Sequence, residues 1–167
     1  SDGTHLVTAG RDMTSKLIVV ETERFVDNIT SITPGALKGG ITALARHPDR
    51  DEIVMGGSDG QPKVYRMQRL TPRKIGDDAN LIRRLPAMRG RVFGVDVSSD
   101  GKRIAAVSSL NGVGQVSTYS YEFDTALPDE IKEIQEKQVE SRSTGEIQKM
   151  EAYRTKDVKR IADVHIP

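Results

Sequence analysis

Three histidines are the residues of this chain best suited to metal binding or acid–base catalysis, but their spacing keeps them apart. His5, His47 and His165 are scattered along the sequence. No two have the four-residue spacing with which a zinc-binding helix presents paired ligands. His47 ends an apolar run directly before Pro48, so we expect it to pack or to cap a turn. The histidines therefore predict no metal centre.

Two Ser-Asp-Gly sequences, at 58–60 and 99–101, contain possible nucleophiles but are better explained as turns. Asp and Ser side chains in such sequences accept hydrogen bonds from nearby backbone N–H groups, and Gly adopts the positive φ of a tight turn. The glycine-rich run 56–60 precedes a strand pattern, whereas a phosphate-binding loop needs a helix N-terminus behind it. We expect no catalytic residue and no cofactor within this chain.

A basic stretch runs from residue 63 to residue 91, where Lys and Arg far outnumber Asp. It could form a patch for an anionic partner. The alternative is an outer strand whose exposed Lys and Arg side chains discourage pairing between sheet edges. No aromatic residue lies between 66 and 91, so the base stacking of single-stranded nucleic acid has no support. The candidate partner-binding residues are Arg69, Arg73, Lys74, Arg83, Arg84 and Arg89.

The elements that position these residues are short apolar runs separated by polar turns. Between residues 39 and 67 the runs are 41–46, 53–57 and 62–66. Each has the length of a strand and is too short for a helix. Gly60 supplies the positive φ of a hairpin turn. The pattern predicts a three-strand antiparallel meander, followed by a fourth strand near 73–75 or 81–85.

The meander recurs along the chain at a spacing of about 45 to 50 residues. A turn and the strand after it occupy residues 1–10, 48–57 and 99–108. The next run occupies residues 16–21, 62–66 and 115–120. The second and third copies also contain the preceding strand, at 41–46 and 92–97, which the first copy lacks.

These turns and runs resemble the WD-repeat β-propeller. Asp12 and Asp59 stand in the tight turn, with Asn111 in the third copy, and Tyr65 and Tyr119 stand where the family often has Trp. No Gly-His dipeptide and no Trp-Asp pair is present, so the side-chain network of a regular WD repeat is not implied. Another antiparallel meander sheet is the alternative.

This resemblance implies an all-β fold, a partial β-propeller of about three four-stranded antiparallel blades in a single domain, residues 1–167. The blades would span 1–38, which is incomplete, then 39–89 and 90–167. It also implies a non-catalytic scaffold for protein–protein interaction. Three blades cannot close into a ring, so their two end faces would meet the remaining blades, a protein partner or a second copy. Self-association of the isolated chain is expected.

Residues 25–30, 41–48, 56–60 and 80–83 resemble more narrowly the propellers of large bacterial proteins that also carry a c-type cytochrome domain. That resemblance implies an accessory module in an extracytoplasmic, periplasmic setting, with the haem on a domain outside this chain. The chain has no cysteine, so no Cys-x-x-Cys-His motif and no haem ligand can be assigned to it. The sequence does not otherwise indicate a compartment.

A helical pattern interrupts the third copy at residues 125–157. Pro128 can start a first helix with Ile131, Ile134 and Val139 near one face, and Glu133 and Lys137 form an i, i+4 pair. Ser143 and Glu146 have the spacing of a capping box for a second helix with apolar residues at 147, 150 and 153.

We therefore expect a helical hairpin inserted before a delayed fourth strand at 159–166. The alternative is one frayed, charged helix. Because the fold does not require it, the insertion is a candidate partner-docking element. The formal net charge is +1, which implies no global attraction to nucleic acid or membrane. No apolar run approaches the length of a membrane span.

Overall fold

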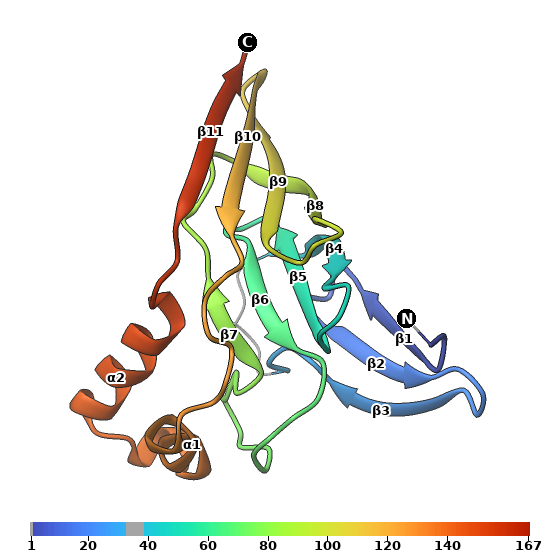
Figure 1. Cartoon of the computed structure of the whole chain (residues 1–167). Helices are drawn as coiled ribbons and strands as arrows, with labels where there is room; N and C mark the ends of the chain where they lie inside the picture. The colour runs from blue at the N-terminus through green and yellow to red at the C-terminus, as the bar shows by residue number, and fades with distance from the viewer. Residues whose placement is uncertain (1, 33–38) are drawn as a thin grey trace.

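The computed structural model describes residues 2–32 and 39–167. These residues form three antiparallel sheets and two α-helices (Figure 1). Within each sheet, neighbouring strands follow one another in the sequence. The chain is therefore mostly β, as predicted, and each sheet is a meander.

The strands have the following bounds. The first sheet contains β1 (His5–Ala9), β2 (Ser15–Val19) and β3 (Arg24–Asn28). The second sheet contains β4 (Ile41–Arg46), β5 (Glu52–Gly57), β6 (Lys63–Arg66) and β7 (Leu81–Arg84). The third sheet contains β8 (Arg91–Val97), β9 (Arg103–Leu110), β10 (Val113–Ser120) and β11 (Arg160–Ile166). The fourth strand of the second sheet thus occupies the second of its two predicted positions.

The turns between strands repeat one hydrogen bond. A backbone N–H donates to the carboxylate of an Asp two residues earlier, at Asp2, Asp12, Asp59 and Asp100. Gly60 and Gly101 have φ of +73° and +68° in these turns, where a side chain would be strained. The Ser-Asp-Gly sequences are therefore turn elements, as predicted.

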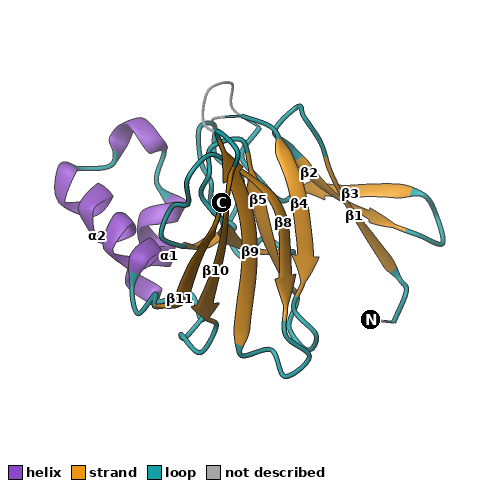
Figure 2. Ribbon diagram, turned by 90° about the horizontal axis from the view of Figure 1, so that it is seen from above, coloured by secondary structure: helices purple, strands orange, loops and turns teal. Residues whose placement is uncertain are grey.

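The three sheets pack against one another through two hydrophobic cores. The first core, between the first and second sheets, contains Leu17, Ile53, Met55, Tyr65 and Leu81. The second core, between the second and third sheets, contains Val54, Val64, Ile82, Val92, Ile104 and Tyr119. Ile53 and Val54 enter different cores, because successive side chains of a strand point to opposite faces. The second sheet is therefore covered on both faces, and Figure 2 shows the first sheet to one side of the stack and the helices to the other.

Two helices connect β10 to β11. They are α1 (Asp129–Glu136) and α2 (Thr144–Thr155), with a 3₁₀ turn, η1 (Val139–Ser141), between them. The predicted capping box is present, because the Ser143 hydroxyl accepts from the Glu146 N–H at 3.2 Å and the Glu146 carboxylate accepts from the Ser143 N–H at 2.8 Å. The helical hairpin is therefore confirmed, and the single frayed helix is wrong.

Two details of the first helix differ from the prediction. The helix ends at Glu136 because Lys137 is extended, with φ −79° and ψ 149°. Val139 therefore belongs to the 3₁₀ turn and not to the helix. The side chain of Lys137 then reaches forward to pair with Glu146, whereas the sequence predicted Glu133 as its partner.

The hairpin has a small core of its own and covers an edge of the second sheet. Ile131, Ile134, Met150 and Tyr153 pack together. Helix α2 contacts β7 (Figure 1), the strand at the outer edge of the second sheet. In the sequence, however, both helices lie between two strands of the third sheet, β10 and β11. An uncovered edge strand invites pairing with other chains. No helix in residues 2–32 and 39–167 is long and apolar enough to cross a membrane.

His47 joins the second and third sheets. Its Nδ1 accepts hydrogen bonds from the backbone N–H groups of Asp49 and Arg50 at 3.1 and 3.0 Å. Its Nε2 therefore carries the proton and donates to the carbonyl of Gly101 at 3.1 Å. The ring is buried and stands edge-on to Tyr121, with centroids 5.0 Å apart. The predicted turn-capping role of His47 is thus confirmed.

This arrangement makes the stability of the chain depend on pH. Burial, helped by the nearby charge of Arg50, lowers the pKa of His47 below its usual range. The folded state then binds fewer protons than the unfolded state, so the unfolding free energy falls as the pH drops below about 6.5, the unfolded value. We expect urea unfolding at several pH values between about 7.5 and 5.5 to show this loss.

Two matched variants separate the contribution of His47 from that of other titratable groups. His47→Gln should remove most of the pH dependence in that window, whereas His165→Gln, on the exposed strand β11, should retain it. An equal loss of stability with falling pH in both variants would contradict this role of His47.

Candidate partner-binding site

The basic stretch divides into separate local contacts. Arg69 forms ion pairs with Asp27 at 3.3 Å and with Asp77 at 3.2 Å, and Arg73 also pairs with Asp27. Because Asp27 lies on β3, these two arginines bind the loop after β6 to the first sheet. Their charges are matched within the chain.

Two further candidates lie apart from the others. Lys74 is half-buried, and its backbone N–H donates to Asp77 at 2.9 Å. Arg89 is exposed near the start of the third sheet, where its backbone N–H donates to the Gln115 side chain at 2.7 Å. The candidates thus do not form one continuous surface.

Arg83 lies inside the molecule with 2% of its surface exposed. Its guanidinium donates to the carbonyls of Lys156, Ile82 and Asp124, each at 2.9 Å. The same group lies 4.6 Å from the ring centre of Tyr153 and 5.2 Å from that of Phe123. Arg83 therefore holds the chain where it leaves for the hairpin, at Asp124, and where it returns, at Lys156.

Arg66 supports the same attachment from the neighbouring strand. Its Nη2 donates to the Tyr153 hydroxyl at 2.8 Å and to the carbonyl of Thr125. Two arginines of the basic stretch thus bind the insertion of the same chain. The two features that the sequence offered as separate docking elements are in contact with each other.

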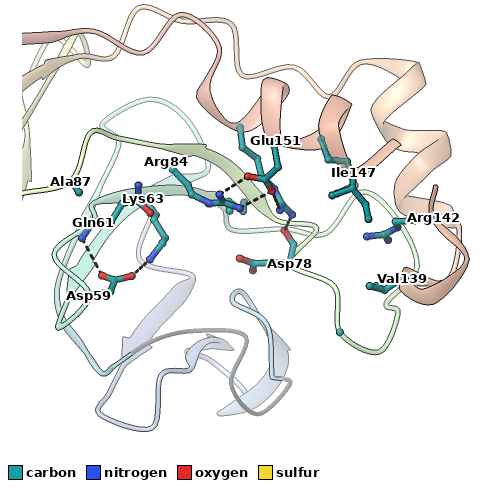
Figure 3. A pocket seen from close by; sticks show the side chains of 14 residues that line it. Asp59, Gln61, Lys63, Asp78, Arg84, Ala87, Val139, Arg142, Ile147 and Glu151 are labelled. Carbon is teal, nitrogen blue, oxygen red and sulfur yellow. Dashed lines mark hydrogen bonds and ion pairs between the residues drawn. The ribbon is translucent and has the colours of Figure 1, made fainter. Parts of the chain in front are cut away.

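The remaining candidate, Arg84, faces a cleft between the hairpin and the second sheet (Figure 3). The cleft has a volume of about 700 Å³. The second sheet and its turns contribute Asp59, Gln61, Lys63, Asp78 and Arg84. The hairpin contributes Val139, Arg142, Ile147, Met150, Glu151 and Arg154.

Ion pairs neutralise most of the cleft. Glu151 accepts from both terminal nitrogens of Arg84, at 2.6 and 2.9 Å, and from Arg154 at 3.1 Å. Partial burial opposes ionisation of Glu151, but the two guanidinium groups hold its pKa below the usual range. At the other end of the cleft, Lys63 pairs with Asp59. Because Arg84 and Arg154 share one carboxylate, these two groups together leave one positive charge without an ion-pair partner of its own.

Asp78 forms part of the wall between Lys63 and the hairpin. Its carboxylate accepts from the Ser31 N–H and from the Tyr65 hydroxyl, each at 3.1 Å. Burial raises the pKa of Asp78. Arg154 donates to the backbone carbonyl of Asp78 at 3.3 Å, so the loop before β7 is tied to α2. Asp78 thus contacts Ser31 and Tyr65 through its carboxylate and Arg154 of α2 through its backbone carbonyl.

Arg142 differs from the other cations of the cleft. It donates from Nε to the carbonyl of Ile134 at 3.1 Å and from Nη2 to those of Gln135 and Lys137 at 3.3 and 3.1 Å. These are the terminal carbonyls of α1, which a cation stabilises. Among the described residues Arg142 forms no ion pair, although the carboxylates of Asp77, Glu140 and Glu146 lie near enough to favour its charge. Burial lowers the pKa of Arg142.

An apolar surface adjoins this unmatched charge. Ile147 on α2 is 49% exposed, and Val139 of the 3₁₀ turn is half-buried. Both line the same cleft as Arg142 (Figure 3). The hairpin end of the cleft can therefore accept an anionic group together with an aliphatic one. Within residues 2–32 and 39–167, no group of three or more His, Cys, Asp and Glu side chains is placed to hold a metal ion.

Sequence reasoning did not identify the hairpin residues of the cleft. A signal was present, because Ile147, Glu151 and Arg154 are spaced by four and then three residues and so share one face of α2. What that face contacts depends on the fold and not on the spacing. In comparisons with known proteins, no protein-family model matches the chain and no curated protein matches it.

Proposed function

We propose that the three sheets are consecutive blades of a WD-repeat-like β-propeller and that the chain is a non-catalytic scaffold for protein–protein interaction. The stacking of the meanders, with the same Asp-centred turn recurring between their strands, supports this arrangement. The observation that carries the proposal is the apolar character of the two outer faces of the stack, which are exposed.

The outer faces carry apolar side chains on neighbouring strands. On the third sheet, Val107 pairs with Val116, which pairs with Val164. Val107 and Val164 are 40% and 54% exposed. On the first sheet, Leu6 and Phe25 flank Ile18 and are 51% and 52% exposed. Contiguous exposed apolar surface of this kind marks an interaction site.

Each exposed face corresponds to a covered face elsewhere in the chain. In the repeat, Leu6 occupies the position of Ile53, which lies in the first core, against the preceding sheet. Ala105 occupies the position of Val54, which lies in the second core, against the following sheet. The outer face of the first sheet therefore matches a face that packs against a preceding sheet. The outer face of the third sheet matches a face that packs against a following sheet.

A second copy of the chain presents both of these faces, and we propose that it covers the outer faces of the first and third sheets. Contact of the third sheet of one copy with the first sheet of another is head-to-tail, and such contacts close into rings when the rotation permits. Two copies would supply six blades, within the range of about four to eight in closed propellers.

The wild-type chain should therefore self-associate, with a mass by light scattering that rises with concentration. Leu6→Lys and Val164→Lys should each be monomeric, because each places a charge on one outer face. An equimolar mixture of the two variants should regain a dimer through the one interface that lacks both lysines.

The control is Ile75→Lys, in an exposed loop, which should associate like the wild type. A wild-type chain that stays monomeric at every concentration would overturn the proposed use of the outer faces. Failure of the mixture to form dimers would exclude a head-to-tail contact.

A further inference from the structure

We propose that the cleft between the hairpin and the second sheet binds an acidic, aliphatic peptide segment of a partner protein. A carboxylate of that segment would pair with Arg142, and a neighbouring aliphatic side chain would pack on Ile147 and Val139. This inference rests on the proposed scaffold function, but it does not depend on self-association through the outer faces.

The size and construction of the cleft suit a bound segment. Its volume of about 700 Å³ falls within the range of about 300 to 1,000 Å³ typical of ligand sites. Its walls come from β6, β7 and the hairpin, with Lys63, Arg84 and Glu151 among the lining residues (Figure 3). Because Arg83 fixes both ends of the hairpin, the walls are held together before any ligand arrives, which lowers the entropic cost of binding.

The charge distribution selects a carboxylate. Arg142 uses Nε and Nη2 for the carbonyls of α1, and no described residue accepts a hydrogen bond from its Nη1. A carboxylate at Nη1 would give the guanidinium an ionised acceptor, and hydrogen bonds of that kind are about twice as strong as neutral ones. It would also add to the effect of Asp77, Glu140 and Glu146, which partly offset the burial that disfavours the charge of Arg142.

The other cations make a polyanion a poorer fit than a peptide. Lys63 is matched by Asp59, and Arg84 and Arg154 share Glu151. A nucleic acid or polyphosphate would have to break these pairs and would leave the exposed Ile147 uncovered. A segment with an acidic residue beside Leu, Ile or Val satisfies Arg142 and buries Ile147 at the same time.

Selection from a random library of short displayed peptides on the full 167-residue chain tests the proposal. Peptides with Asp or Glu next to Leu, Ile or Val should be enriched. Fluorescein-labelled copies of these peptides should bind the wild type and should lose about tenfold or more in affinity with Ile147→Glu, which adds a repelling charge and removes the apolar contact.

Ile161→Glu is the matched control, because Ile161 on β11 is exposed to a similar degree, 56% against 49%, but does not line the cleft. It should bind the peptides like the wild type. Arg142→Gln should weaken binding comparably to Ile147→Glu. Because Arg142 also caps α1, the Arg142→Gln variant is informative only if its circular dichroism spectrum matches that of the wild type. If the spectrum differs, the test rests on Ile147→Glu alone.

Enrichment of peptides without acidic residues, no enrichment at all, or enriched peptides whose affinity Ile147→Glu leaves unchanged would overturn the proposal. The result is separable from that for the outer faces. A chain that self-associates but fails in peptide selection retains the scaffold proposal and loses this one.

Discussion

Replacement of Arg83 by Met is expected to lower the free energy of unfolding by about 3 kcal/mol or more. The substitution removes the donor to the carbonyls of Ile82, Asp124 and Lys156, and a buried group left without a partner costs about 1 to 3 kcal/mol. The stacking of the guanidinium on Tyr153 and Phe123 is lost as well. Urea unfolding measures the change.

The hairpin should also become mobile in this variant. Its two connections to the third sheet pass beside Arg83 at Asp124 and Lys156, so limited proteolysis should cut there faster than in the wild type. Arg84→Met is the control from the adjacent position. Its ion pair with Glu151 is partly exposed on both sides, 28% and 44%, and pairs of this kind contribute about 0 to 1 kcal/mol. Equal destabilisation by both substitutions would contradict the assigned role of Arg83.

Replacement of Tyr119 by Ala is expected to lower the free energy of unfolding by about 3 to 5 kcal/mol, as for other large aromatic residues in cores. Tyr119 has no exposed surface and lies in the second core, between the second and third sheets. Removal of its ring leaves a cavity between two stacked sheets. The variant should show an earlier urea midpoint and should bind a hydrophobic dye more strongly.

Tyr119→Phe separates the ring from the hydroxyl. The hydroxyl donates to the carbonyl of Pro86 at 2.9 Å, and a single such bond contributes about 1 kcal/mol. The Phe variant should therefore retain most of the stability that the Ala variant loses. If the two variants were equally destabilised, the hydrogen bond to Pro86, and not the packing of the ring, would hold the two sheets together.

Most strands could be predicted from the sequence, including the exposed strand β11, whereas β3 could not. Runs such as 53–57 are apolar because both faces of the second sheet are covered. The third strand of the first sheet, β3, was not among the predicted strands. Of its five residues only Phe25 and Val26 are apolar, so the sequence carries no strand pattern there.

The partners of the basic residues could not be predicted, because they are distant in the sequence. The pattern indicated either a patch or an exposed strand, yet Arg83 and Arg84 lie adjacent and have opposite environments. Arg83 is buried against Tyr153, and Arg84 meets Glu151 on the cleft side. Their partners belong to the hairpin, whose helices the sequence located but whose docking position it did not indicate.

The docking of α2 on β7 has a consequence for the order of folding during synthesis. Helix α2 contacts β7 of the second sheet, but it emerges from the ribosome only after β8, β9 and β10 of the third sheet. The edge strand β7 of the second sheet therefore stays uncovered by α2 until most of the third sheet has been synthesised. Until then its outer edge is open to other nascent chains, and contacts this distant in sequence slow folding. A hairpin that completes the cleft in the finished molecule thus also sets the interval in which the unfinished one is most prone to aggregate.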